Sequence, residues 1–331
     1  MPEVSVVLPV FNGARTVARA VGSILGQTLR DIELIVVDDG STDHTVAVLQ
    51  KVRDPRLRLV QCPHRGVAST ANAGTTLARA PVIARMDADD FAYPLRLEKQ
   101  LALLDQQKLD VAGCKIRILN ESNGPAASLQ RYERWINEET IDGEQIAALR
   151  FVELPLVNPT ILARRSYFEL GFRHGEFPED YDLMLRAAAK GMRFGKVDEV
   201  LLDWIDGPGR LSRTDSRYSA DAFARCRQTH LLDGPLKGVA QVDLWGLGET
   251  GKPWLRWLQA HGIAVRRGYD VSDRKIGETI HGVRVAHYTE MPPADGTPLM
   301  IAVGAEGSRE LILPHITAQG YVSGSNAWFV A

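Results

Sequence analysis

Three aspartates, Asp87, Asp89 and Asp90, stand within four residues directly after a short apolar run. Carboxylates two residues apart on a turn can approach one divalent cation. Such oxygen ligands suit Mg²⁺ or Mn²⁺, whose open positions bind substrate phosphates. A cation held there would neutralise charge that develops on a diphosphate leaving group. Because short acidic turns also occur without a ligand, the interpretation of Asp87 and Asp89 as metal ligands depends on the surrounding sequence.

Two further acidic pairs lie where they could serve the same chemistry. Asp38 and Asp39 follow a second apolar run, and they could bind a base or a ribose, although a turn or a helix cap explains them as well. Glu179 and Asp180 open a segment of helical periodicity. A carboxylate there could take the proton from an acceptor hydroxyl, whereas compensation of the helix dipole is the simpler explanation.

Regular elements must bring these acids together. Four apolar runs, at 4–8, 33–37, 57–61 and 82–86, alternate with segments of helical periodicity at 14–28, 43–52 and 66–79. This alternation predicts an α/β fold with a mainly parallel sheet and helices on both faces. Ligands of such sheets bind at the carboxyl ends of the strands, and three polar segments lie at those ends: 9–12, 38–41 and 87–90.

The composition changes around 233–240, where we predict a linker between a first domain, 1–235, and a second domain, 236–331. In the second domain an apolar run precedes three glycines, and Asp270 ends the next apolar run nineteen positions after the last of them. Glycines at this spacing let backbone amides approach a pyrophosphate at a helix N-terminus. The pattern predicts a small Rossmann-like α/β domain, with a candidate nucleotide site at Gly246, Gly248, Gly251 and Asp270.

The motifs of the first domain resemble those of glycosyltransferase family 2, and they occur in the family's order from about residue 3 to residue 215. The matching segments are 9–13, 23–28, 33–43, 66–68, 72–74, 84–90, 94–100 and 179–183. The resemblance implies a GT-A fold and an inverting transfer from a nucleoside-diphosphate sugar. UDP is the favoured carrier, because uridine is the commoner base in the family. The acceptor would be a hydroxyl of a glycan or a glycolipid, and the metal would be Mg²⁺ or Mn²⁺.

The resemblance also implies roles for single residues. Pro9, Phe11 and Asp39 would hold the nucleotide. Asp87 would lie near the ribose and diphosphate, and Asp89 would be the principal metal ligand.

Further residues would act on the acceptor and the diphosphate. Asp180 would be the general base, and its neighbour Glu179 would orient the acceptor or a loop. Arg213 lies in a basic segment, 210–213, and its guanidinium would clamp phosphate oxygens. The chain departs from the family at Asn158, where many relatives have histidine before the proline.

For the second domain, an NAD-type ligand is one interpretation of the glycine motif. The remaining chain is only about half of a full dinucleotide-binding fold, and glycosyl transfer needs no hydride. We therefore favour a structural or partner-docking use of this domain.

Composition and charge limit the classes of binding partner and the cellular compartment that we expect. A formal net charge of −2 does not indicate a nucleic-acid binder. Three separated cysteines, Cys62, Cys114 and Cys226, argue against a disulfide framework and favour a reducing cytoplasm. No apolar run reaches the length of a membrane span. We predict a cytoplasmic protein and leave open peripheral association with the inner face of the membrane. The sequence predicts no oligomeric state.

Two alternatives remain at this stage. A nucleotidyltransferase would also use acidic pairs, but the segment 9–15 lacks the glycine-rich, basic character of a triphosphate loop. A nucleotide-binding regulatory protein would instead depend on the C-terminal glycine motif. The segment 121–175, where acceptor-binding loops would lie, follows no recognisable pattern.

Overall fold

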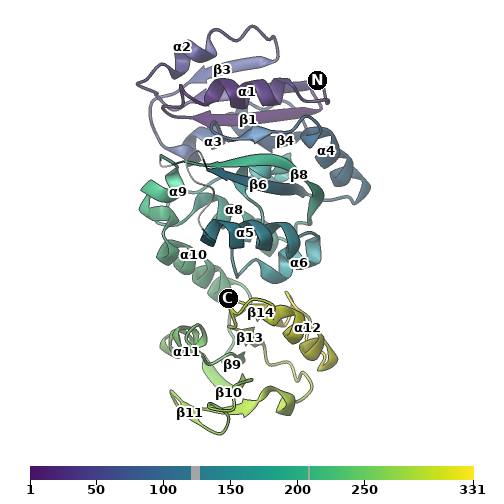
Figure 1. Ribbon diagram of the computed structural model, residues 1–331, viewed down its shortest axis with the longest axis vertical. Helices are drawn as coiled ribbons and strands as arrows, with labels where there is room; N and C mark the ends of the chain where they lie inside the picture. The colour runs from purple at the N-terminus through teal and green to yellow at the C-terminus, as the bar shows by residue number, and fades with distance from the viewer. Residues whose placement is uncertain (121–126, 208) are drawn as a thin grey trace. The chain divides into compact units, whose positions relative to one another are not determined.

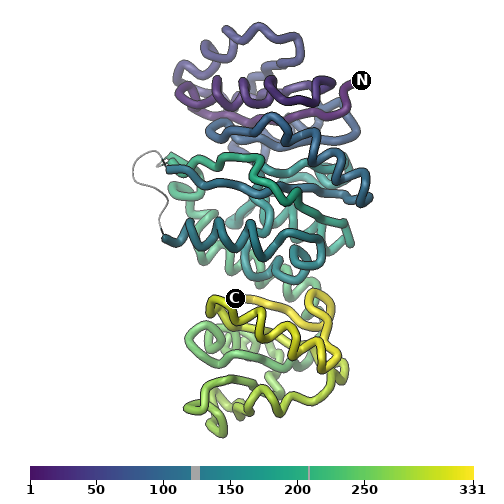
Figure 2. Tube along the Cα trace, turned by 45° about the vertical axis from the view of Figure 1, so that its right-hand side comes forward, coloured from purple at the N-terminus to yellow at the C-terminus, as the bar shows by residue number. Residues whose placement is uncertain are grey.

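The computed structural model describes residues 1–120, 127–207 and 209–331. It divides into two compact units, each with a sheet of its own: Met1–Ile146 with Pro155–Cys226, and Ala147–Leu154 with Arg227–Ala331. Figure 1 labels the elements, and Figure 2 follows the chain from purple at the N-terminus to yellow at the C-terminus. The boundary at residue 235 stays a prediction.

The N-terminal part of the first unit forms the predicted β–α repeats. Its elements are β1 (Val4–Val10), α1 (Val17–Leu25), β2 (Ile32–Asp38), α2 (Thr45–Leu49), β3 (Leu57–Gln61), α3 (Val67–Leu77) and β4 (Val82–Arg85). β1 pairs in parallel with β2 and β4, and β2 pairs in parallel with β3. The carboxyl ends of these four strands therefore meet at one edge of the sheet.

The rest of the unit adds strands in both directions. It contains β5 (Phe91–Ala92), α4 (Arg96–Gln106), β6 (Val111–Asn120), α5 (Ala127–Glu138), β7 (Leu162–Arg164), α7 (Arg165–Phe168), α8 (Glu179–Ala189), β8 (Phe194–Asp206) and α9 (Leu211–Thr214). Two further helices, α6 (Gly143–Leu149) and α10 (Ala220–Asp233), begin in this unit and end in residues of the second. The strand order is β3-β2-β1-β4-β7-β6-β8-β5. β7 runs antiparallel to β4 and β6, and β5 antiparallel to β8, whereas β6 and β8 are parallel. The mixed, mainly parallel sheet expected from the sequence is confirmed.

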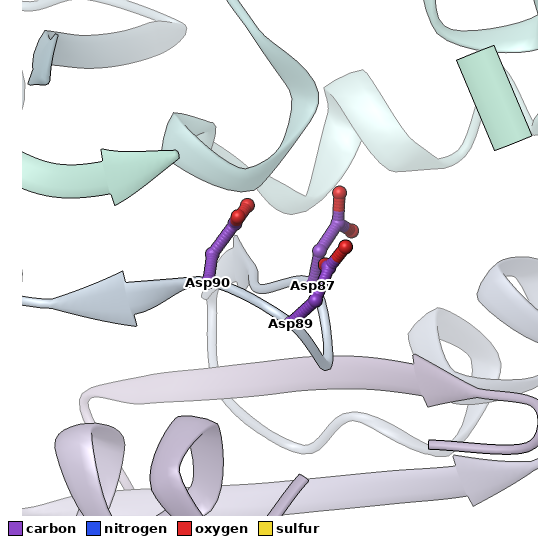
Figure 3. A group of neighbouring side chains, drawn as sticks. All are labelled: Asp87, Asp89 and Asp90. Atoms are coloured by element: carbon purple, nitrogen blue, oxygen red, sulfur yellow. The ribbon is translucent and has the colours of Figure 1, made fainter. Parts of the chain in front are cut away.

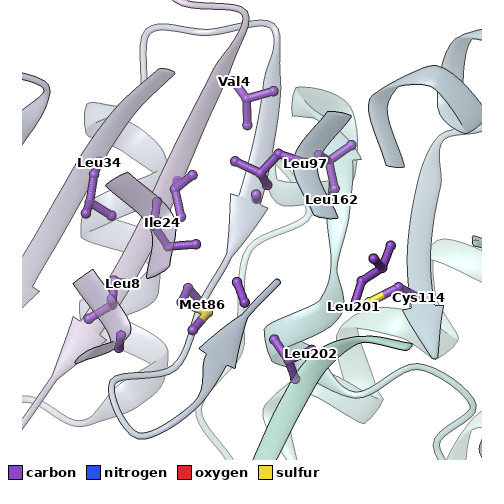
Figure 4. Close-up of a cluster of buried hydrophobic side chains, with 14 of the residues drawn as sticks. Val4, Leu8, Ile24, Leu34, Met86, Leu97, Cys114, Leu162, Leu201 and Leu202 are labelled. Carbon is purple, nitrogen blue, oxygen red and sulfur yellow. The ribbon is translucent and has the colours of Figure 1, made fainter. Parts of the chain in front are cut away.

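One face of this sheet packs against α1 and α4. Val4 and Leu8 of β1 and Leu34 of β2 belong to the same buried cluster as Ile24 of α1 and Leu97 of α4 (Figure 4). These strand residues are two or four positions apart or lie on neighbouring strands, so their side chains share a face. Burial of this apolar surface is the main favourable contribution to folding, and it fixes the helices that follow the site loops.

The opposite face packs against α3 at very short range. An added Cβ at Gly74 would lie 2.3 Å from Cγ1 of Val7 and 3.2 Å from Cγ2 of Val37. Only a residue without a side chain lets the helix approach β1 and β2 so closely. Helices therefore cover both faces, as predicted.

The second unit has a smaller sheet. Its elements are β9 (Gln241–Trp245), α11 (Gly251–Ala260), β10 (Ala264–Asp270), β11 (Thr279–Ile280), β12 (Val283–His287), β13 (Leu299–Ile301), α12 (Ser308–Ala318) and β14 (Ala327–Phe329). The order is β11-β12-β10-β9-β13-β14, and every pair apart from β11–β12 is parallel. This is the Rossmann-like α/β arrangement that the sequence predicts.

A short piece from the middle of the chain belongs to this second unit. In the segment 147–154, the ring of Phe151 meets that of Trp328 edge to face, with centroids 5.8 Å apart. The guanidinium of Arg150 lies 4.7 Å from the centroid of the Trp328 ring. Gly324 packs against the backbone of Ala147 and Ala148.

In the ranges that the structure describes, no helix has the length and apolar character needed to cross a membrane.

The close approach of α3 to the sheet gives a test of the fold. Gly74→Ala should lower the free energy of unfolding by about 1 to 3 kcal/mol, because the new methyl group overlaps Val7. Gly22→Ala in α1 is the matched control. Its Cβ would meet no atom within 4 Å, so it should stabilise the helix by up to about 1 kcal/mol. Chemical denaturation of both variants measures the difference, and equal stabilities would contradict this packing.

Candidate active site

The acidic loop between β4 and β5 gathers three carboxylates. One carboxylate oxygen from each of Asp87, Asp89 and Asp90 lies within 4.8 Å of those from the other two. Figure 3 shows the three side chains projecting to the same side of the loop. Asp87 and Asp89 are half-buried, and Asp90 is fully buried. The geometry is therefore that of a small cage of oxygen ligands, open on the side of Asp87 and Asp89.

Two buried arginines hold the base of this loop. Arg85, at the end of β4, donates from Nη1 to the Val7 carbonyl at 3.0 Å and from Nη2 to Oδ1 of Asp87 at 3.1 Å. Arg96, in the first turn of α4, donates to the Arg85 carbonyl at 2.7 Å and to Gln100 at 3.1 Å. Charge-assisted hydrogen bonds of this kind are the strong ones in proteins, so they fix where the acidic loop leaves the sheet.

Asp90 ties the loop to β8. Its Oδ1 accepts a hydrogen bond from the Ile205 amide at 2.8 Å. Its Oδ2 is buried and has no hydrogen-bond partner among the described residues. Burial raises the pKa of Asp90 well above its usual range, and burial raises the pKa of Asp89 as well. An orphaned buried oxygen beside two further carboxylates is chemically unfavourable unless a cation faces it, so the residues present fit a hard divalent ion.

The basic segment after β8 reaches this cage through Arg210. Its Nη1 lies 3.5 Å from Oδ1 of Asp90, and its Nη2 lies 3.9 Å from Oδ2 of Asp87. Arg213, which the family resemblance links to the diphosphate, forms a two-pronged ion pair with Asp206 instead of facing the cage. Of the two arginines in the segment 210–213, Arg210 is thus the one whose guanidinium contacts the three aspartates, on the side away from the Arg85–Asp87 pair of the sheet.

The loops after β1 and β2 form the neighbouring part of the site. Asp39 accepts hydrogen bonds from the backbone amides of Arg65 and Gly66, both at 2.9 Å. His64 Nδ1 lies 2.9 Å from Oδ2 of the same carboxylate, and its ring stacks on Phe11 with centroids 4.2 Å apart. Phe11 is 47% exposed, so one apolar ring face is available to a planar ligand beside a carboxylate acceptor.

A pocket of about 210 Å³ opens beside Asp39, lined also by Cys62, Pro63 and residues of α3. The loops around it are cross-linked by Asn12, a residue with a positive φ of 50°. Oδ1 of Asn12 accepts hydrogen bonds from the amides of Thr42 and Asp43.

Pro9 lies in β1, paired with Val37 of β2. The expected nucleotide residues Pro9, Phe11 and Asp39 thus lie on adjacent strands or the loops that follow them.

The helix α8 brings the third acidic pair toward this edge. Asp180 is half-buried, and burial together with the charges of Glu179 and Asp87 raises its pKa to about 7. Glu179 is 3% exposed and accepts hydrogen bonds from the Tyr218 hydroxyl at 2.6 and 2.8 Å. A carboxylate with a pKa near neutrality is suited to take up and release a proton at physiological pH.

Asp182 anchors the same helix from its inner side. Its buried carboxylate pairs with Nε of Arg186 at 2.8 Å and with Nε of Arg173 at 2.9 Å. Arg186 also donates to the carbonyls of Leu170 and Gly171. These bonds hold the first turn of α8, and therefore Asp180, against the loop 170–173.

The glycine motif of the second unit forms a closed turn. Gly246 has a φ of 96°, and an added Cβ at Gly251 would overlap its carbonyl oxygen at 1.7 Å. Asp270 accepts hydrogen bonds from the Leu247 amide at 3.0 Å and from Nζ of Lys275 at 2.8 Å. The amides of residues 271 and 272 also donate to this carboxylate. Asp270 therefore holds the loop that contains Gly248, rather than presenting free oxygens to a ribose.

The structure brings most of the expected residues of the first unit to one edge of the sheet. Sequence reasoning gave no individual role to Arg85, Arg96, Arg210 or Tyr218, although Arg85, Arg96 and Arg210 lie in segments that it singled out. Arg85 could have been identified from the sequence, because a charged residue near the end of an apolar run is unusual. Arg210 stands in the basic segment already noted. Tyr218 carries no signal in the sequence that singles it out. Residues 121–126 of the segment expected to bind the acceptor lie outside the described residues.

A mixed sheet of this order, with an acidic cage after its central strand, defines a glycosyltransferase of the GT-A fold. A crystal structure of TarS from S. aureus, in complex with UDP-GlcNAc, shares this fold with a TM-score of 0.56 at 20% identity, covering 72% of this chain and 68% of that one. The family model of glycosyl transferase family 2 matches residues 5–172. The chain belongs to this family, and the protein is a glycosyltransferase.

Relatives in polysaccharide biosynthesis agree with this assignment. The succinoglycan biosynthesis protein ExoO of Rhizobium meliloti (strain 1021) is 37% identical over 73% of this chain and 71% of its own length. ExoU, a second succinoglycan biosynthesis protein of that organism, is 27% identical over 94% of this chain and 95% of its own length. The second alignment therefore extends into the C-terminal unit.

The anchoring of α8 can be tested by stability. Asp182→Asn should lower the free energy of unfolding by about 2 to 3 kcal/mol, because two guanidinium groups lose a buried ionic acceptor. Glu199→Gln removes a carboxylate from a surface pair with Lys99 and should cost less than about 1 kcal/mol. Denaturant unfolding of the two variants gives the comparison. A loss at Glu199 as large as that at Asp182 would argue against the anchoring role.

Proposed function

We propose that the enzyme moves a sugar, with inversion at its anomeric carbon, from a UDP-sugar to a hydroxyl of a glycan or glycolipid acceptor, with Mg²⁺ or Mn²⁺. The observation that carries the proposal is the acidic cage at the sheet edge that also holds Asp39 and Phe11. The GT-A neighbour TarS supports a uridine donor, since it was crystallised in complex with UDP-GlcNAc. The relatives' role in succinoglycan biosynthesis supports a glycan acceptor.

Asp89 and Asp87 would hold the cation, with Asp90 behind them. When bound, the cation supplies positive charge to the leaving diphosphate. Phe11 offers a ring face to the base, and the Asp39 carboxylate offers hydrogen-bond acceptors to base or ribose. Pro9 shapes the strand end on which these groups stand, and Arg213 lies in the segment that would contact the phosphates after releasing Asp206.

Asp180 would act as the general base. It accepts the proton of the acceptor hydroxyl while that oxygen attacks the anomeric carbon and the bond to the diphosphate breaks. A single displacement of this kind inverts the anomeric configuration and needs no covalent sugar–enzyme intermediate. Glu179, held by Tyr218, sets the charge next to this base and helps to orient the acceptor side of the site.

For the second unit we propose a structural or docking use rather than NAD-type binding. The carboxylate of Asp270 is already engaged by Leu247, Lys275 and its own turn. A dinucleotide would have to break these hydrogen bonds to reach it. The glycines at 246 and 251 are explained by the tight turn alone.

Donor turnover tests the proposed function directly. Release of nucleoside diphosphate from UDP-sugars should require Mg²⁺ or Mn²⁺, and Asp89→Ala should lower kcat by about 100-fold or more, since it removes charge stabilisation of the leaving group. Asp105→Asn, a surface carboxylate paired with Arg164, is the control and should keep full activity. Undiminished turnover in chelator, or in Asp89→Ala, would contradict the metal assignment. Turnover of only another nucleotide's sugars would contradict the uridine donor.

The raised pKa of Asp180 predicts the pH dependence of the rate. Because the base must be ionised to accept a proton, kcat should rise with pH through a midpoint near 7 and then level off. Glu179→Gln should move the midpoint to lower pH, since it removes a neighbouring negative charge that raises this pKa. Asp180→Asn should reduce kcat by about 10² to 10⁴ and abolish the rise. Full activity of Asp180→Asn would rule out this residue as the base.

A further inference from the structure

The guanidinium of Arg210 occupies an unusual position for a surface arginine. Its side chain is only 10% exposed, although it precedes a short helix in a connecting segment. Nη1 donates to the Ile205 carbonyl at 2.6 Å, and the guanidinium carbon lies 3.8 Å from the centroid of the Trp204 ring. The group is thus held by β8 and stacked on an aromatic face, with its charge directed at the acidic cage.

The same carboxylates that would coordinate a cation face this guanidinium. Nη1 lies 3.5 Å from Oδ1 of Asp90 and Nη2 lies 3.9 Å from Oδ2 of Asp87. A divalent ion would sit about 2.1 Å from its oxygen ligands. An ion bound to Asp89 and Asp87, with Asp90 behind them, would therefore lie within a few ångströms of the guanidinium. Two positive charges at that separation repel strongly where water is excluded.

Arg213, three residues further on, does not share this position. Its guanidinium is neutralised by Asp206, outside the cage. Arg217 pairs in the same way with Asp215 inside its own turn. Of these three arginines in one segment, only Arg210 has an ion-pair contact with the cage aspartates. The positive charge at this place is therefore a property of one side chain rather than of the segment.

We propose that Arg210 is the resident counter-ion of the acidic cage, and that the divalent cation enters by displacing its guanidinium. The proposal rests on the metal role assigned to these aspartates under the proposed function. Without metal, Arg210 offsets the charge of Asp90 and adds to Arg85 in offsetting that of Asp87, and so keeps the cage assembled. With metal, the guanidinium leaves the cage, and the segment 209–214 must move with it because Arg210 begins the turn into α9. Metal binding and movement of this segment are thus one event.

Titration of the full-length protein with Mn²⁺, without nucleotide, tests the exchange. Arg210→Gln should bind Mn²⁺ about tenfold to hundredfold more tightly than the wild type, because the ion no longer displaces an ionic contact. Arg210→Lys, which keeps the charge, should stay closer to the wild type. Arg217→Gln removes a charge from the same segment without touching the cage and should leave the Mn²⁺ affinity unchanged. Asp89→Ala should abolish the titration and so identify the site.

Thermal unfolding and tryptophan fluorescence test the same exchange without measuring the Mn²⁺ affinity directly. Metal-free Arg210→Gln should unfold at a lower temperature than the wild type, and Mn²⁺ should raise its Tm by a larger amount. Saturating Mg²⁺ should change the emission of Trp204 as the guanidinium leaves its ring, and that change should vanish in Trp204→Phe.

The outcomes separate this inference from the proposed function. If the wild type and Arg210→Gln bind Mn²⁺ at the Asp89-dependent site with equal affinity, Arg210 is not the counter-ion, and the metal assignment stands. If neither binds Mn²⁺ and turnover proceeds without metal, both the metal assignment and the exchange are wrong. Tighter binding in Arg210→Gln with Arg217→Gln unchanged supports the exchange.

Discussion

Placing three carboxylates at the end of a central strand is the constraint on which the rest of the catalytic unit depends. Carboxylates that are removed from water must be compensated by charge or hydrogen bonds, or they become protonated. Here Arg85 supplies a full charge to Asp87 from within the sheet, and Ile205 supplies an amide to Asp90 from β8. The mixed half of the sheet is thus more than an extension of the parallel half, because it carries one wall of the acidic cage.

The arginines that support the site are themselves buried, and a second layer of groups supports them. Arg96 is held by Gln100, whose side-chain amide donates to the carbonyls of Ala112 and Thr160. The loop, α4, β6 and the turn before β7 are therefore joined by one chain of hydrogen bonds.

The sequence predicts the parallel half of the sheet well, because the apolar runs there have the length of strands and the polar residues stand directly after them. The apolar runs at 4–8, 33–37 and 82–86 have no competing pattern, and acids at their ends point to a ligand edge. The placement of Arg210 could not be predicted in this way. Three arginines stand at 210, 213 and 217, and their order along the chain does not reveal which carboxylate each one reaches. That choice is made by β8, which brings Asp206 and Ile205 alongside β6, and by the ring of Trp204. Tyr218 is similar, since its bond to Glu179 joins residues that lie 39 positions apart.

The piece 147–154, which packs against Trp328 and Gly324, bears on how such proteins can be recombined. The chain enters the C-terminal unit, returns to the catalytic unit and enters the C-terminal unit again, so neither unit is one continuous stretch. A gene fusion at a single junction could not exchange the C-terminal unit between relatives without leaving Trp328 beside a foreign partner. An engineered chimera would need to transplant both segments, 147–154 and 227–331, together.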